Sequence, residues 1–82
     1  MVIGLASEET WRSIPLYYAI VEELERRGGN AKDIELYRAI RDKFDVTFSE
    51  FLRALMKLEM QGIIYVNVLK ENLRNVELIA KS

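Results

Sequence analysis

The spacing of the apolar residues changes at Gly62, and this change constrains the fold more than any other feature of the sequence. Before Gly62, the residues Phe51, Leu55 and Leu58 recur every three or four positions, which is the period of an amphipathic helix. After it, apolar residues alternate along the chain in the manner of a β-strand. A helix followed directly by a strand in a chain of 82 residues predicts one small domain of the α+β class.

The helix before Gly62 has the clearest start signal in the chain. Thr47 and Glu50 form a T-x-x-E capping box, in which each side chain bonds a main-chain amide of the other residue. Gly62 suits the end of a helix because glycine adopts the left-handed conformation without strain. The sequence therefore predicts a helix over residues 47–61, with an apolar inner face and an outer face that carries Glu50, Arg53, Lys57 and Gln61.

Two earlier helices are predicted from the same spacing. The first covers residues 14–27, where Ser13 can cap the start, Pro15 suits the first turn, and two glycines follow the last turn. The second begins between Asn30 and Asp33 and ends near residue 44. Only two residues then separate it from the third helix, which is the length of a helix-turn-helix corner. We therefore expect a three-helix core over residues 13–62, with a helix-turn-helix at 31–62.

The alternating pattern at residues 63–80 predicts an antiparallel hairpin of two strands. Its tip is expected near residues 69–74, because Lys70, Glu71 and Asn72 form a polar turn between two apolar runs. The predicted fold is thus α+β and mostly α, with three helices followed by a two-stranded hairpin.

This order of elements, and the stretch LMKLEMQGIIYVNV in particular, resembles the winged-helix (winged helix-turn-helix) superfamily in its small archaeal form. In that superfamily a Leu-Glu pair, a glycine and an aliphatic pair recur where the recognition helix meets the wing, as Leu58-Glu59, Gly62 and Ile63-Ile64 do here. The resemblance implies that helix 47–61 enters a DNA major groove and that the wing, at residues 69–75, contacts the adjoining backbone. The DNA-contacting residues that it implies are Thr47, Ser49, Arg53, Lys57, Lys70, Asn72, Arg74 and Asn75.

The chemistry of these residues is compatible with that role, but each also has a structural alternative. An arginine can bond both acceptors of a guanine edge, whereas a lysine supplies a mobile charge for phosphate. Arg53 could instead pair with Glu50 one turn earlier, and Lys57 could be an ordinary solvated lysine. Glu59 falls within the apolar arc of its helix, so it requires partners, either amides at the helix-to-strand junction or an arginine.

The composition removes several classes of function. The chain has no cysteine and no histidine, which excludes a disulfide, a Cys/His zinc site, a thiol nucleophile and an imidazole base. It also lacks a glycine-rich phosphate loop and a GxSxG turn. We therefore expect neither an enzyme nor a bound cofactor or metal. The absence of Cys and His, together with plentiful Glu, Lys and Arg, suits a thermophile.

Net charge bears on the DNA hypothesis. The chain carries −1 overall, whereas nucleic-acid binders usually have a positive excess. On the expected reading surface, however, Arg53, Lys57, Lys70 and Arg74 outnumber Glu50 and Glu71 by two. Neutralising about four phosphates per subunit gives modest affinity, so a DNA-binding form is expected to be a dimer.

The N-terminal arm, residues 1–12, is apolar for so short a segment. It either folds back over the first helix or packs on a second copy of the chain, through Val2, Ile3, Leu5 and Trp11 together with Leu16 and Tyr18. It does not have the pattern of a signal peptide, and no apolar run is long enough for a membrane span, so a cytoplasmic protein without membrane contact is expected.

Two functions from different classes therefore remain open. The first is a dimeric transcriptional regulator that binds double-stranded DNA. The second is a winged-helix protein interaction module, or a subunit of a larger assembly that does not read DNA itself.

Overall fold

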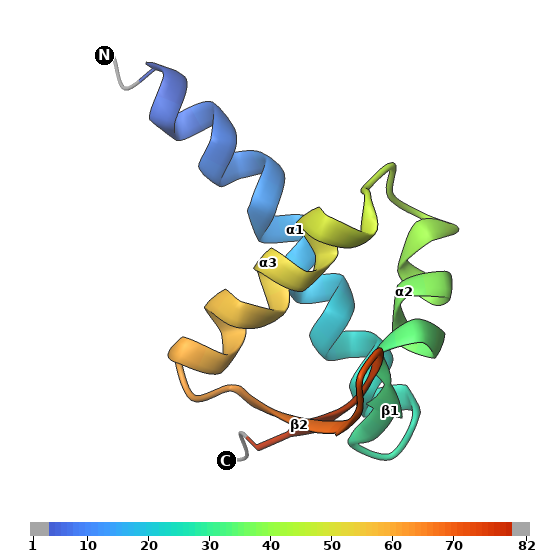
Figure 1. The fold of residues 1–82 in the computed structure, drawn as a ribbon. Helices are drawn as coiled ribbons and strands as arrows, with labels where there is room; N and C mark the ends of the chain where they lie inside the picture. The colour runs from blue at the N-terminus through green and yellow to red at the C-terminus, as the bar shows by residue number, and fades with distance from the viewer. Residues whose placement is uncertain (1–3, 80–82) are drawn as a thin grey trace.

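The computed structural model describes residues 4–79 of the chain, and over that range it forms three helices and one three-stranded antiparallel sheet (Figure 1). The elements follow one another as α1 (Gly4–Arg26), β1 (Asn30–Lys32), α2 (Asp33–Arg41), α3 (Phe48–Met60), β2 (Ile64–Lys70) and β3 (Leu73–Leu78). The α+β class predicted from the sequence is confirmed, and so is the antiparallel hairpin, as β2 and β3.

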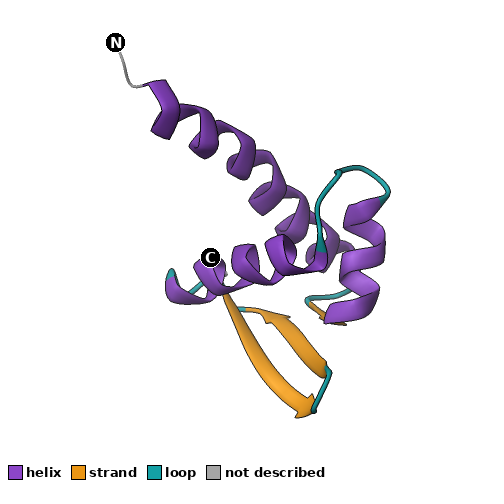
Figure 2. Cartoon of the chain, turned by 45° about the horizontal axis from the view of Figure 1, so that its top comes forward, coloured by secondary structure: helices purple, strands orange, loops and turns teal. Residues whose placement is uncertain are grey.

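The expected two-stranded sheet is wrong, because β1 adds a third strand. The strand order is β1-β3-β2, so β3 lies in the centre, and Ala31 of β1 pairs with Val76 of β3. Three residues are too few to display an alternating pattern, which is why this strand was not predicted. Since β1 reaches only Asn75–Glu77, it anchors the base of the hairpin, and the outer part extends away from the helices (Figure 2).

The first helix is longer than predicted. It begins at Gly4 rather than near Ser13, and Pro15 lies inside it. A proline is disfavoured inside a helix because it lacks an N–H and crowds the preceding turn, so its presence pointed to a helix start. The residues from Gly4 to position 12, which were expected to form a separate arm, are the first part of α1. This part of the helix points away from the other elements and does not fold back over the rest of α1 (Figure 1). Of the arm's apolar residues, Val2 and Ile3 and the side chains of Leu5 and Trp11 lie outside what is described.

Glycines end both long helices, as the sequence predicted. After α3, Gly62 has a φ of +76°, Ile63 donates its N–H to the carbonyl of Leu58 at 3.0 Å, and Gly62 donates to Glu59 at 2.9 Å. These two bonds form a Schellman motif, which satisfies carbonyls that the helix end leaves free. Gly28, with a φ of +84°, occupies the equivalent place after α1.

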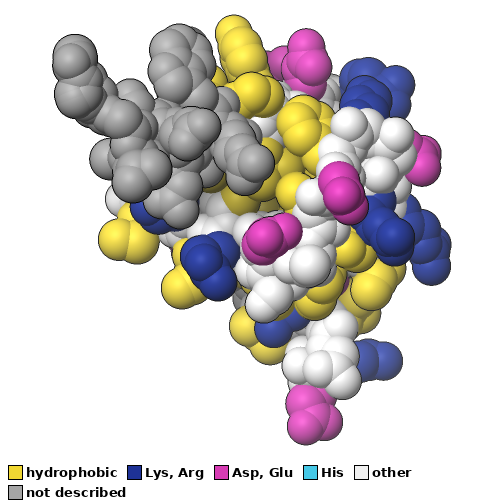
Figure 3. Space-filling view, turned by 90° about the horizontal axis from the view of Figure 1, so that it is seen from above, with side chains coloured by type: hydrophobic (Ala, Val, Ile, Leu, Met, Phe, Trp, Pro, Cys, Tyr) yellow, Lys and Arg dark blue, Asp and Glu magenta, His cyan; other side chains and the backbone are white. Residues whose placement is uncertain are grey.

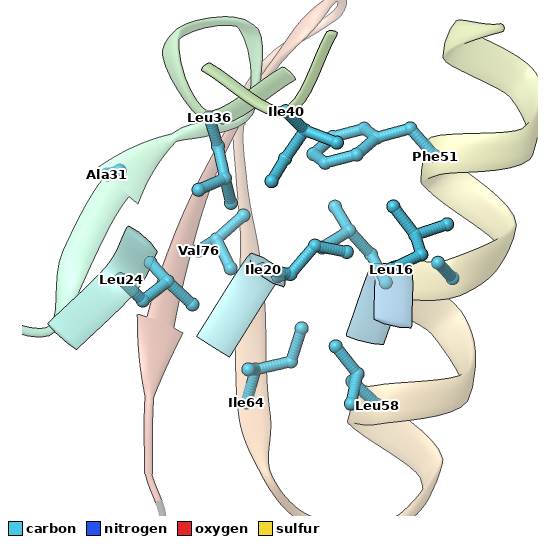
Figure 4. Packing of buried hydrophobic residues seen from close by; sticks show 12 residues of the cluster. Leu16, Ile20, Leu24, Ala31, Leu36, Ile40, Phe51, Leu58, Ile64 and Val76 are labelled. Atoms are coloured by element: carbon cyan, nitrogen blue, oxygen red, sulfur yellow. The ribbon is translucent and has the colours of Figure 1, made fainter. Parts of the chain in front are cut away.

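The core lies where the three helices meet the sheet (Figure 4). The predicted apolar face of α3 is buried, with Phe51 at 0% exposure. Leu16 of α1 is also buried, at 8% exposure, so it cannot form the intermolecular contact expected of it, whereas Tyr18 is 72% exposed. The buried apolar residues are Leu16, Ile20, Leu24, Ala31, Leu36, Ile40, Phe51, Ala54, Leu55, Leu58, Ile64 and Val76.

Candidate nucleic-acid interface

The capping box predicted at the start of α3 is present. Thr47 Oγ1 accepts a hydrogen bond from the N–H of Glu50 at 3.1 Å, and the N–H of Thr47 donates to Glu50 Oε1 at 2.9 Å. Both side chains are therefore used to begin the helix. The carboxylate of Glu50 also lies at the positive end of the helix dipole, beside Thr47, which was expected to contact DNA.

The face of α3 opposite the core carries Ser49, Arg53, Met56 and Met60, which are spaced by four, three and four residues. All four are exposed, as is Lys57 beside them. Arg53 does not pair with Glu50, and neither Arg53 nor Lys57 joins any ion pair within residues 4–79. Two predicted DNA-contacting cations thus remain available on this face.

Sequence reasoning missed the two methionines on this face. Met60 is 82% exposed and Met56 is 57% exposed, although both side chains are apolar. The signal was their spacing, because Met56 lies one turn after Arg53 and Met60 one turn after Met56. The outer face of α3 is therefore partly apolar, which is unusual beside phosphate and common at protein interfaces.

The predicted wing residues do not all share one surface. Lys70 and Asn72 are exposed at and beside the turn, while Asn75 is half-buried in the middle of the sheet, paired with both Asn67 and Lys32. Successive residues of a strand point to opposite faces, so Arg74 lies on the same side as buried Val76, toward the helices. Lys70 joins none of the ion pairs of the described residues, so of the predicted wing cations it alone supplies a free positive charge near the hairpin tip.

Arg74 is bound to a buried carboxylate. Asp33, which is 0% exposed, accepts the main-chain N–H of Arg74 at 3.3 Å and its Nη1 at 2.9 Å. Asp33 is the first residue of α2, where the helix dipole stabilises a negative charge. Lys32 occupies the N-cap position of α2 but makes no capping hydrogen bond with its side chain. The pair ties the base of the hairpin to α2, so the charge of Arg74 is already neutralised.

Glu59 has the kind of partner that its position required. Its Oε2 accepts the N–H of Val66 at 3.3 Å, and Val66 belongs to β2, just beyond the helix-to-strand junction. Glu59 is exposed rather than buried, however. Because β2 is an edge strand, this bond covers one amide that the sheet leaves free, which discourages pairing with another strand.

A separate charge cluster lies at the end of α1. Glu23 is buried and accepts hydrogen bonds from Arg26 Nη2 at 3.1 Å and Arg27 Nε at 2.8 Å. The Arg27 bond lowers the pKa of the Glu23 carboxyl below its ordinary value of 4.5; burial opposes this shift, and the charges of Arg26, Arg27 and Lys43 add to it. No buried side-chain nitrogen or oxygen among the described residues lacks a partner, so the buried charges of this region are used to hold the fold.

The charge balance of the candidate surface is weaker than the sequence indicated. Because Asp33 neutralises the charge of Arg74, the expected excess on this surface falls from two positive charges to one. In Figure 3, basic and acidic side chains are interspersed on the face shown, and no broad patch of one sign covers it. Any DNA affinity must therefore come from a few contacts.

No family model, curated protein or solved structure matches the chain. None of the helices within residues 4–79 has the length and apolar character that a membrane crossing requires. The same part of the chain contains no cluster of three or more acidic residues placed to hold a metal ion.

Proposed function

We propose that the chain is a winged-helix protein that binds double-stranded DNA, with α3 directed into the major groove and the β2–β3 hairpin as its wing. Support comes from the order of the elements, in which α2 and α3 are followed by a projecting hairpin. The connection between these helices, residues 42–47, is longer than the two residues expected from the sequence, because α2 ends at Arg41 and not near residue 44. The third strand is compatible with this assignment, because β1 pairs only with the base of β3 and leaves the Glu71–Asn72 turn free.

One observation carries the proposal: α3 and the wing carry three exposed cations, Arg53, Lys57 and Lys70. None of the three takes part in the ion pairs of the described residues. Arg53 is suited to bond both acceptors of a guanine edge, and the lysines are suited to phosphate. Ser49 and Asn72, also exposed, add neutral hydrogen-bonding groups to the same elements. Arg74 holds the wing against α2 and does not read bases.

The proposed role is that of a dimeric transcriptional regulator in the cytoplasm. Three free cations per subunit neutralise about three phosphates, which gives weak binding for one subunit. Two subunits on adjacent half-sites double the number of contacts and add specificity through the spacing of the sites.

Fluorescence anisotropy with a labelled random-sequence duplex at low salt tests this proposal. Arg53→Ala and Lys57→Ala should each weaken binding, because each removes one cation from the surface that contacts the phosphates. Lys43→Ala is the matched control, because Lys43 is an exposed lysine that belongs to neither α3 nor the wing and lines a depression with Glu22 and Glu25. Equal affinities for all variants, or no binding by the wild-type protein, would contradict the proposal.

A second candidate function is favoured by the exposed methionines. Met56 and Met60 form an adaptable apolar surface on the same face of α3, which suits a protein partner rather than a phosphate backbone. In that case α3 docks on a protein, binding is insensitive to salt, and Met56→Ser with Met60→Ser abolishes it. Weaker duplex binding by the same double variant, with an unchanged salt dependence, would instead place the methionines against DNA.

A further inference from the structure

The connection between α2 and α3, residues 42–47, is longer than a tight helix-turn-helix corner, so specific contacts must fix its course. It extends beyond the ends of both helices before the chain enters α3 (Figure 1). Asp42, Lys43 and Asp45 are exposed, and none of them joins an ion pair of the described residues. The position of α3 relative to α2 therefore depends on contacts made by other residues.

Tyr37 makes such contacts with each part of this helix-turn-helix. It belongs to α2, and its hydroxyl donates a hydrogen bond to the main-chain carbonyl of Val46 at 2.9 Å. Its ring packs against α3, with centroid distances of 5.1 Å to Phe48 and 5.3 Å to Phe51. The guanidinium of Arg41, one turn later in α2, lies 5.9 Å from the centre of the same ring. One side chain thus joins α2, the connection and the start of α3.

The carbonyl that Tyr37 binds lies directly before α3. Val46 is half-buried against the core, and the next residue, Thr47, is the N-cap whose capping box begins the helix. A contact at the residue before the N-cap fixes the direction from which the chain enters a helix. The hydroxyl of Tyr37 therefore acts at the point that sets where α3 begins.

We propose that the hydroxyl of Tyr37 positions α3 for DNA binding by fixing the place where the chain enters this helix. The inference rests on the proposed function, because the residues placed in this way are the proposed DNA contacts. Ser49 and Arg53 follow Val46 by three and seven residues, so a shift at the start of α3 displaces both. Tyr37 is a positioning residue, half-buried on α2, and acts on DNA only through α3.

The variant Tyr37→Phe isolates the effect of the hydroxyl. It keeps the ring and its contacts with Phe48 and Phe51, and it removes only the donor to Val46. Tyr17→Phe is the matched control, since Tyr17 is also a half-buried tyrosine that packs against the core. The hydroxyl of Tyr17 makes no hydrogen bond with a described residue, so its removal should change little. Circular dichroism confirms that both variants are folded.

Amide hydrogen exchange tests the placement of α3 without DNA. The amides of Thr47, Glu50 and Phe51 are hydrogen-bonded at the start of the helix. Loss of the hydroxyl in Tyr37→Phe should speed their exchange by about 2- to 10-fold, and by more than the exchange of the β3 amides. A hydroxyl that only stabilises the whole fold would speed both sets equally. Tyr17→Phe should leave both sets unchanged.

Fluorescence anisotropy with the random-sequence duplex tests the connection to DNA. Tyr37→Phe should weaken binding by about 2- to 10-fold. The slope of log Kobs against log salt concentration should stay the same, because no cation is removed. Arg53→Ala should instead reduce the size of that slope by about 0.9, so the two measurements separate a positioning residue from a contact residue.

The outcomes distinguish this inference from the proposed function. Unchanged exchange at the start of α3 in Tyr37→Phe, equal changes there and in β3, or a duplex affinity equal to that of the wild type would each overturn the inference. A wild-type protein that binds no duplex would refute the proposed function. The exchange result would then decide by itself whether Tyr37 fixes the start of α3.

Discussion

Removing the side chain of Arg74 should destabilise the protein far more than removing that of an exposed, unpaired arginine. Arg74→Ala leaves the carboxylate of Asp33, which is 0% exposed, without its charged partner. Breaking a buried ion pair from one side costs about 3–5 kcal/mol, because the remaining charge stays out of water. The main-chain N–H of residue 74 still donates to Asp33, and the Arg74 side chain is 28% exposed, so water can reach the site. We therefore expect the low end of that range, about 3 kcal/mol.

Such a loss is large for a chain of this size, since a domain of 82 residues has a total stability of about 4–12 kcal/mol. Urea unfolding followed by circular dichroism measures the change in the free energy of unfolding. Arg53→Ala is the control, because Arg53 is exposed and unpaired and should change stability by less than about 0.5 kcal/mol. Asp33→Ala should cost about 2–3 kcal/mol, from two lost hydrogen bonds and an orphaned amide, while the freed guanidinium turns toward water. Equal stability of Arg74→Ala and Arg53→Ala would refute the structural role of the pair.

Three further changes test the local reasoning. Thr47→Ala should cost about 1 kcal/mol in urea unfolding, because one amide of the first turn of α3 loses its cap, and Thr47→Ser should restore most of it. Gly62→Ala should cost about 1–2 kcal/mol through backbone conformation alone, since φ is +76° and no atom lies within 4 Å of an added Cβ; a neutral effect would contradict that reasoning. The pKa of Glu23 is lowered in the folded state, so its stabilising contribution is present above the ordinary value of 4.5 and is lost as the pH falls through the folded value. Glu23→Gln should therefore show a smaller loss of stability than wild type on acidification below pH 4.5, and parallel curves would contradict this.

The parts of the fold that depend on neighbouring residues could be predicted from the sequence. The limits of α3 follow from Thr47, Glu50 and Gly62, all of which act within one turn of the helix end, and the structure has them where they were expected. In contrast, Asp33 and Arg74 are 41 positions apart, and nothing in their local sequence indicates that they meet. An arginine that was expected to contact DNA is for this reason part of the fold.

Two other differences have equally physical causes. Strand β1 has three residues, so its existence depends on pairing with β3 and not on any pattern of its own. Pro15 is acceptable in the first turn of a helix and costly inside one, so its place in the middle of α1 could not be read from residue preference. In both cases the surrounding structure overrides the local residue preference. Prediction from a single sequence is weakest in such cases, because it uses local preference alone.

The exposed face of α3 decides between the two candidate functions, because it carries both free cations and free methionines. In the proposed DNA complex, Arg53 and Lys57 would act mainly through charge, which salt screens. A protein partner would instead bind Met56 and Met60 through apolar contact, which salt does not weaken. The response of binding to salt therefore distinguishes the two functions more directly than affinity does.

The salt dependence of duplex DNA binding is the most direct test of the central claim. With Arg53, Lys57 and Lys70 each neutralising one phosphate, the slope of log Kobs against log salt concentration should be about −2.7 per subunit, and twice that for a dimer. Replacing these three residues with alanine should bring the slope close to zero, while Lys43→Ala should leave it unchanged. No detectable binding at low salt, or the same slope in the triple variant, would contradict DNA binding through α3 and the wing.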